Sequence, residues 1–179
     1  MPLPIAYYGD PVLRKKGAEI KVFDEKLKQL VRDMEETLHA KNGIGLAAPQ
    51  VHQSLALFLV CPPIRAEEGS PEKWLPGKVR VFINPKLSNP SDEMAYWNEG
   101  CLSIPGLYED VLRPESITVE AMDEHGTPFK EDFSGFTARI IMHENDHING
   151  VLYIDRLNKQ ERAALDHELR EIKKKYHKK

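Results

Sequence analysis

A chain of 179 residues with 41% hydrophobic residues is long enough to build one domain around one core. No run approaches the roughly 18 to 20 apolar residues of a membrane span, and the first ten residues lack the basic and apolar segments of a secretory signal. We therefore expect no membrane partner and no export. The net charge of −3 also argues against a protein that coats DNA, because such proteins carry a strong positive excess.

The two cysteines do not have the spacing of a disulfide framework or of a zinc ribbon. Cys61 and Cys101 lie forty residues apart, and the chain contains no CxxC pair. Reduced thiols are the default state of cysteine in the cytoplasm. The sequence is thus typical of a cytoplasmic protein.

The first fifty residues predict one helix and one shaped loop. Apolar residues recur at intervals of three and four from Asp24 to Ala40, which is the spacing of an amphipathic helix, and Asp24 suits its N-cap. KNGIGLAAPQ (41–50) follows. Its glycines permit close backbone approach, and Pro49 is expected to stop regular structure.

Strands are predicted in the middle of the chain. The short apolar runs 55–60 and 79–83 indicate buried strands. Between them, residues 62–78 contain too many prolines and glycines for a helix or a central strand, so we expect an excursion on the surface. Residues 117–123 and 129–133 flank the turn sequence EHGTP and predict a hairpin.

Two further helices are predicted in the last third of the chain. The first covers 136–149 and ends at Asn149 and Gly150, a suitable pair for a helix C-terminus. The second begins after Asn158, with Glu161 completing a possible capping box, and continues to a lysine-rich end. Because helices and strands do not alternate regularly, the order of elements favours an α+β fold.

The sequence HENDH (143–147) places a candidate metal site on the first of these helices. His143 and His147 are four residues apart, so their imidazoles lie one turn apart on one face and can reach one ion. Glu144 is then suited to exchange protons with a water on that ion. The alternative is that both histidines are hydrogen-bonded core residues and that Glu144 and Asp146 form a solvated face.

A catalytic metal site needs a third protein ligand and an open position. Cys101, which lies in WNEGCLSIPG, is a candidate, although a free cysteine is also a small residue that packs well in cores. Cys61 ends a buried strand with no polar cluster around it, so we assign it a structural role. On chemical grounds alone, two imidazoles and a thiolate favour zinc.

Three stretches occur in a fixed order: GIGLAAPQ (43–50), EGCLS (99–103) and HENDH (143–147). Together they resemble the three motifs of the peptide deformylases, GxGxAAxQ, EGCxS and HExDH, and match every fixed position. The flanking helices are also similar to the bacterial form. The resemblance implies a single domain over 1–179, with mainly antiparallel sheets around a central metal-binding helix and with N-terminal and C-terminal helices.

The resemblance also implies a metal centre and a reaction. The implied metal is one Fe2+ per chain, for which Ni2+, Co2+ or Zn2+ can substitute. The reaction is hydrolysis of the N-formyl group from the N-terminal methionine of newly made polypeptides, which releases formate. The residues carried over are Cys101, His143 and His147 as metal ligands, Glu144 as general base and acid, and Gln50 with the backbone N–H of Leu102 as oxyanion donors.

Two other functions remain alternatives at this point. The chain could be another HExxH metal-dependent peptidase or amidase, against which Cys101 and Gln50 count. It could also be a binding module with a structural metal or none. A closed structural site would need a fourth protein ligand, which the motifs do not supply.

The implied methionine side chain needs an apolar pocket. Ile44 is the strongest candidate wall because it lies between the two loop glycines, whereas Leu46 and Ile140 are better explained as core. Gly45 can offer its backbone to an extended peptide. The predicted substrate-binding residues are Ile44, Gly45, Trp97, Glu99 and Phe136.

Supporting interactions are predicted around the metal ligands. Glu99 and Arg113 are expected to pair and hold the cysteine loop, and Asp146 to orient a ligand histidine. The chain departs from the family at Tyr108, where many members have an arginine, and at Met142, where glutamine is frequent. The surface excursion is also longer than in many compact members, which leaves contacts beyond the first substrate residue open.

The C-terminal segment 159–179 is basic. It holds eight Lys or Arg and four Asp or Glu, which leaves 17 basic and 24 acidic residues in the rest of the chain. Lys173–Lys175, Lys178 and Lys179 either dock on ribosomal RNA near the peptide exit, or only complement the helix dipole and keep the chain end soluble.

Overall fold

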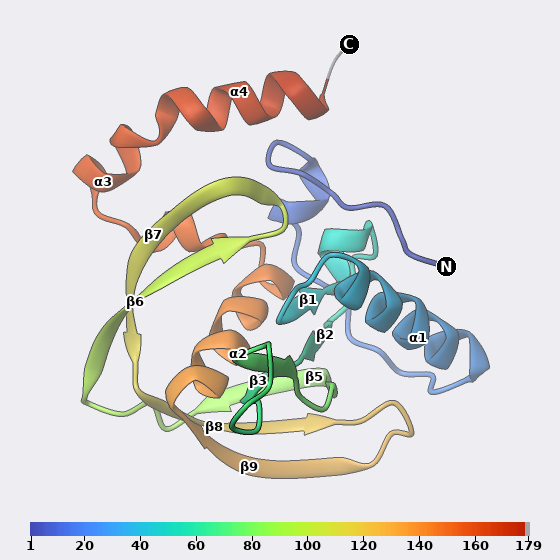
Figure 1. Cartoon of the computed structure of the whole chain (residues 1–179). Helices are drawn as coiled ribbons and strands as arrows, with labels where there is room; N and C mark the ends of the chain where they lie inside the picture. The colour runs from blue at the N-terminus through green and yellow to red at the C-terminus, as the bar shows by residue number, and fades with distance from the viewer. Residues whose placement is uncertain (178–179) are drawn as a thin grey trace.

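The computed structural model describes residues 1–177 and has an α+β fold with helix α2 at its centre (Figure 1). This confirms the predicted fold class, including the mainly antiparallel sheets. In chain order the elements are η1 Pro11–Arg14, α1 Glu25–Ala40, β1 Gly45–Ala47, η2 Ala48–Val51, β2 Leu57–Val60, β3 Pro63–Arg65, β4 Trp74–Pro76, β5 Arg80–Ser88, β6 Met94–Cys101, β7 Ile104–Pro114, β8 Ser116–Met122, β9 Pro128–Ser134, α2 Gly135–Ile148, η3 Tyr153–Arg156, α3 Lys159–Ala164 and α4 Asp166–Tyr176, where η marks a 3-10 helix.

A five-stranded antiparallel sheet in the order β1-β2-β5-β8-β9 lies between α1 and α2. Strand β2 contributes side chains to the apolar clusters on both faces of the sheet. Leu57 and Leu59 belong to the apolar cluster with α1, whereas Phe58 and Val60 belong to the cluster with α2. Because side chains alternate along a strand, the uninterrupted apolar run LFLV buries one pair on each face.

Several elements confirm the sequence-based predictions. The Asp24 side chain caps α1 by accepting a hydrogen bond from the Leu27 N–H (3.0 Å). Strands β8 and β9 pair as the predicted hairpin. Helix α2 ends one residue before the predicted boundary, with Asn149 as its C-cap and Gly150 at a φ of +74°. Among residues 1–177, no helix combines the length and the apolar character that crossing a membrane requires.

Three predicted elements need correction. The loop 41–50 contains strand β1 and the start of η2, and Pro49 is accommodated because the first residues of a helix need no N–H. The strand predicted at 79–83 continues to Ser88. The C-terminal helix is divided at Leu165 into α3, which buries none of its residues, and α4, which buries Leu169 and Ile172.

The hairpin β6–β7 was not predicted from the sequence. It is the longest pairing in the fold, from Met94 opposite Pro114 to Cys101 opposite Ile104, with a register shift between Gly100 and Cys101. In Figure 1 it curves around α2 on the side away from α1. The hairpin therefore brings Cys101, at the end of β6, to the helix that carries HENDH.

Candidate metal centre

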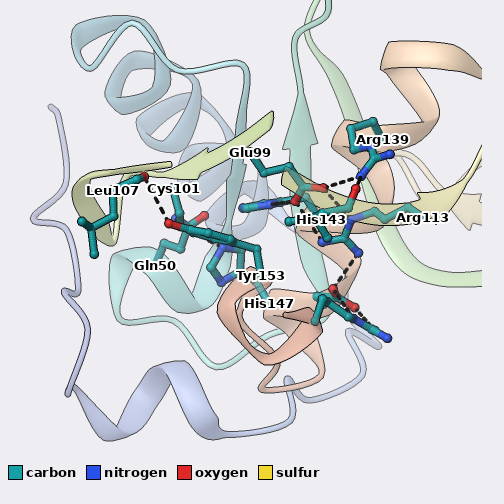
Figure 2. Close-up of polar contacts among 12 residues, drawn as sticks. Gln50, Glu99, Cys101, Leu107, Arg113, Arg139, His143, His147 and Tyr153 are labelled. Atoms are coloured by element: carbon teal, nitrogen blue, oxygen red, sulfur yellow. Dashed lines mark hydrogen bonds and ion pairs between the residues drawn. The ribbon is translucent and has the colours of Figure 1, made fainter. Parts of the chain in front are cut away.

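Cys101, His143 and His147 come together at the junction of β6 and α2 (Figure 2). One ligand atom from each residue lies within 4.8 Å of the other two. The Cys101 Sγ atom is 3.3 Å from His147 Nε2, and the two imidazole rings are 5.1 Å apart. A thiolate with two imidazoles fits a first-row transition metal, and three protein ligands leave a position for water or substrate.

Glu99 orients one of the two histidines. Its Oε1 atom lies 2.8 Å from His143 Nδ1, so the other ring nitrogen of His143 is free to face the metal site. Burial opposes the charge on Glu99, yet hydrogen bonds from His143 and Arg113 hold the pKa of this carboxyl well below its usual range. Burial likewise opposes a charge on His143, but Cys101 and Glu99 raise the pKa of His143 to about 10. An imidazole binds a metal ion in its neutral form.

Arg113 joins two buried carboxylates. It donates to Glu99 through Nε (2.7 Å) and one terminal nitrogen (3.0 Å), as predicted, and to Asp146 through the other terminal nitrogen (2.8 Å). Asp146 also accepts two hydrogen bonds from Arg156 (3.2 and 2.7 Å). The expectation that Asp146 orients a ligand histidine is not met, because its carboxylate faces these guanidinium groups.

Within the described part of the chain His147 Nδ1 has no partner, and burial holds the pKa of His147 well below its usual value.

Two residues beside the centre were missed by the sequence analysis. Arg139 donates to Glu99, to the Val111 carbonyl and to the Ala95 carbonyl. Tyr153 stacks on the His143 ring at 6.0 Å and donates to the Leu107 carbonyl (3.1 Å). Arg139 had a detectable signal: it lies four residues before His143, so it is a charged residue on the same inward face of α2.

Glu144 is buried beside the loop glycine Gly45. A Cβ atom at position 45 would lie 2.5 Å from Glu144 Oε1, so the backbone and the carboxylate approach this closely only because residue 45 is glycine. Glu144 Oε2 has no hydrogen-bond partner among the described residues. Burial raises the pKa of Glu144 to about 7, although the charge of His143 opposes this shift. A carboxyl group with a pKa near neutrality is suited to accept and return a proton.

The side-chain amide of Gln50 is held in one orientation. Its Oε1 accepts a hydrogen bond from the Ala47 N–H (2.9 Å), and its Nε2 donates to Ser103 Oγ (3.2 Å) and lies 3.4 Å from Cys101 Sγ. The amide oxygen is thus bonded to the backbone, and the NH2 group faces the cysteine loop. This arrangement presents a hydrogen-bond donor beside the metal ligands.

A cavity of about 490 Å³ opens beside these groups. Of the predicted residues, Ile44, Gly45, Leu102 and Phe136 line it, as does Ile140. Glu99 also lines it, together with the candidate ligands Cys101 and His143 and with Gln50, Glu144, Tyr108 and Arg139. Trp97 is not among the lining residues; it stacks on Phe136 at 5.5 Å and supports it from behind. Leu46 is fully buried in the cluster with α1.

The chain matches a family model and several known proteins. The model of the polypeptide deformylases matches residues 2–163. Peptide deformylase 1B of chloroplasts and mitochondria from Arabidopsis thaliana is 42% identical over 178 residues, which cover 99% of this chain and 62% of that protein. A peptide deformylase of Pseudothermotoga lettingae is 42% identical over 168 residues, with 94% and 90% covered. A crystal structure of a plant peptide deformylase of the 1B type superimposes with a TM-score of 0.88 at 41% identity, covering 99% of this chain and 92% of the other.

Arg113 and Arg156 provide a matched pair for testing the buried charge network. The Arg113 side chain is 5% exposed and neutralises two carboxylates, whereas the Arg156 side chain is 48% exposed and binds only one of them. We expect Arg113→Ala to lower the free energy of unfolding by about 3 kcal/mol or more, because it removes a buried charge partner from both Glu99 and Asp146 at once. Arg156→Ala should cost about 1 kcal/mol or less. Urea unfolding at neutral pH measures both, and equal losses would contradict the network.

Proposed function

The chain belongs to the polypeptide deformylase family, and we propose that the centre formed by Cys101, His143 and His147 holds the catalytic metal of this enzyme. The protein removes the N-formyl group from nascent peptides and releases formate. The observation that carries the proposed site is that Cys101, His143, Glu144 and Gln50 line one cavity, with a ligand atom of His147 within 4.8 Å of those of Cys101 and His143. The alternative of a peptidase or another amidase is not favoured, since the matches to deformylases extend over nearly the whole chain.

The metal, when bound, supplies a Lewis acid that polarises the formyl carbonyl and activates a water molecule. Glu144 accepts the proton of the attacking water on a carboxylate oxygen. As the new C–O bond forms and the C–N bond breaks, Glu144 returns the proton to the departing amine nitrogen, which leaves as the free N-terminus. The second product is formate. A group with a pKa near neutrality can perform both transfers.

Gln50 and Leu102 are the proposed donors to the negative charge that develops on the formyl oxygen. The Ala47 N–H and Ser103 already hold the Gln50 amide beside the candidate ligand Cys101. Leu102 lies in the turn after Cys101 and lines the same cavity, which supports a role for its backbone N–H. Both donors would stabilise the transition state more than the substrate, as rate acceleration requires.

The methionine side chain is proposed to occupy the apolar part of the cavity. Ile44 and Phe136 form its accessible walls, and Gly45 offers its backbone to the peptide main chain. Trp97 acts on the pocket through Phe136. Glu99 is better described as the residue that positions His143 than as a methionine contact, because its oxygens are engaged by the histidine and by two arginines.

We propose Fe2+ as the native metal, one ion per chain, with Ni2+, Co2+ or Zn2+ able to substitute. A site of one thiolate and two imidazoles accepts several of these ions, so the donor set supports this range. We further propose that residues 1–179 form one catalytic domain. Two cysteines without a disulfide partner support a cytoplasmic location.

We expect the protein purified without oxygen to hydrolyse an N-formyl-Met-Ala peptide with release of formate and to leave N-acetyl-Met-Ala intact. Cys101→Ser should lose the metal and the activity together, because the thiolate is a proposed ligand. Cys61→Ser is the matched control, since the Cys61 thiol is buried and contacts the Gly77 carbonyl instead. Metal content by elemental analysis and formate release measure both effects. Equal hydrolysis of the two peptides would overturn the assignment.

Glu144→Gln should retain the metal and lose turnover by about 10²- to 10⁴-fold, because the proton carrier is removed while the ligands remain. In the parent enzyme only the ionised carboxylate can accept a proton, so kcat/KM should fall as the pH drops through the pKa of Glu144. That pKa is about 7 without a metal, and a cation beside the carboxylate lowers it, so this limb is expected at or below pH 7. Nickel-loaded enzyme assayed between pH 5 and 9 provides the profile; a rise in rate toward acid would contradict Glu144 as the base.

The basic C-terminal segment is proposed to dock on the ribosome. Lys173–Lys175 lie in the last turns of α4, whereas Lys178 and Lys179 lie outside the described residues. Replacing Lys173–Lys175 with glutamine should reduce co-sedimentation with ribosomes and make it less sensitive to salt, because fewer phosphate contacts would remain. Association of the parent protein that does not change with salt would count against this proposal.

A further inference from the structure

Arg139 lies at the contact between helix α2 and the hairpin β6–β7. Its side chain is 5% exposed, and its guanidinium group donates to three acceptors on the hairpin: Glu99 Oε2 (2.8 Å), the Val111 carbonyl (2.7 Å) and the Ala95 carbonyl (2.8 Å). Figure 2 shows this group beside Glu99 and His143. One side chain therefore holds both strands of the hairpin.

The contacts of Arg139 join the same two elements that carry the candidate metal ligands, the hairpin β6–β7 and helix α2. Cys101 comes from the hairpin, whereas His143 and His147 come from α2. Arg113 joins the hairpin to α2 by one hydrogen bond, to Asp146, while its bonds to Glu99 lie within the hairpin. Arg139 instead directs all three of these hydrogen bonds from the helix to the hairpin. The distance between the Cys101 thiolate and the two imidazoles thus depends on the position of the hairpin relative to α2, and the contacts of Arg139 hold that position.

Arg139 also shares a carboxylate with a metal ligand. It binds Glu99 Oε2, while His143 binds Glu99 Oε1. With one oxygen fixed from the helix, the carboxylate keeps the orientation that directs the His143 ring. The Arg139 guanidinium also lies over the Trp97 ring at 5.7 Å, and Trp97 stacks on the cavity residue Phe136.

We propose that Arg139 is a positioning residue for the deformylation reaction, which sets the spacing of the metal ligands and supports the wall of the methionine pocket. This inference rests on the proposed function for its reaction. Its contacts, however, act on the metal centre itself, so they can be tested by metal binding without any substrate.

Two substitutions separate the charge of Arg139 from its geometry. Arg139→Met keeps the aliphatic stem and removes every donor. Arg139→Lys keeps the charge but presents a point donor that cannot reach three separate acceptors in one plane. We expect Co2+ affinity to fall by about 10- to 100-fold in the methionine variant, as for other groups that support a metal ligand, and by less in the lysine variant.

Three measurements test the proposal. Competition with a chelator gives the Co2+ affinity, and the visible absorption of the Co2+-loaded protein reports the geometry of the thiolate and imidazole ligands. Steady-state kinetics should show a lower kcat from the disturbed ligands and a higher KM from the loosened Phe136 wall, with both partly restored in the lysine variant.

Asn84→Ala controls for a general loss of stability. The Asn84 side chain holds the backbone of Ile20 with two hydrogen bonds (2.9 and 2.8 Å), so its removal weakens the fold through the N-terminal segment. This variant should keep the parent Co2+ spectrum and affinity. If Arg139→Met behaves as Asn84→Ala does, the positioning role is wrong. If the methionine variant does not fold, parent affinity and spectrum in Arg139→Lys overturn the proposal.

The same measurements distinguish this inference from the proposed function. A parent protein that binds Co2+ but does not release formate would overturn the proposed function. The Co2+ affinity and spectrum of the Arg139 variants would still test the positioning role of Arg139 in that case.

Discussion

The metal centre depends on one buried carboxylate, that of Glu99. A charge removed from water is costly unless it is paired and hydrogen-bonded, and Glu99 satisfies this requirement with two guanidinium groups and one imidazole. These partners come from β7 and from α2, so satisfying the charge also fixes the helix against the hairpin. A stability requirement and a catalytic requirement are thereby met by the same contacts.

The parts of the fold that could be predicted are those whose burial follows a local period. Helix α1 shows its apolar stripe directly, and β2 shows a run that is apolar on both faces. The hairpin β6–β7 does not, because its inward positions include Glu99 and Arg113, which interrupt the alternation expected of a half-buried strand. Strand β1 has only three residues, too few to show a period of their own, and it is defined by its pairing with β2.

In the candidate site, too, only the features that follow from a local period could be predicted from the residues. The spacing of His143 and His147 follows from helix geometry. Cys101 was one candidate for the third ligand, and the resemblance to a known family favoured it and added Gln50. The pairing of a carboxylate with a ligand histidine depends on the tertiary structure and cannot be read from the local sequence. Asp146 is close to the ligands in sequence but faces arginines, while Glu99, forty-four residues before His143, reaches its ring. Arg139 and Tyr153 were missed because their partners lie on the hairpin.

The approach of Gly45 to Glu144 has a consequence for how this site can change. The backbone of Gly45 and the Glu144 carboxylate, which we propose as the proton carrier, lie so close that a methyl group on residue 45 would overlap the carboxylate. A compound that hydrogen-bonds to the main chain at this position contacts a surface without a side chain to alter. A substitution of Gly45 would push the Glu144 carboxylate from its place. Substitutions that weaken the binding of such a compound are therefore expected in the surrounding walls, such as Ile44, Tyr108 and Phe136.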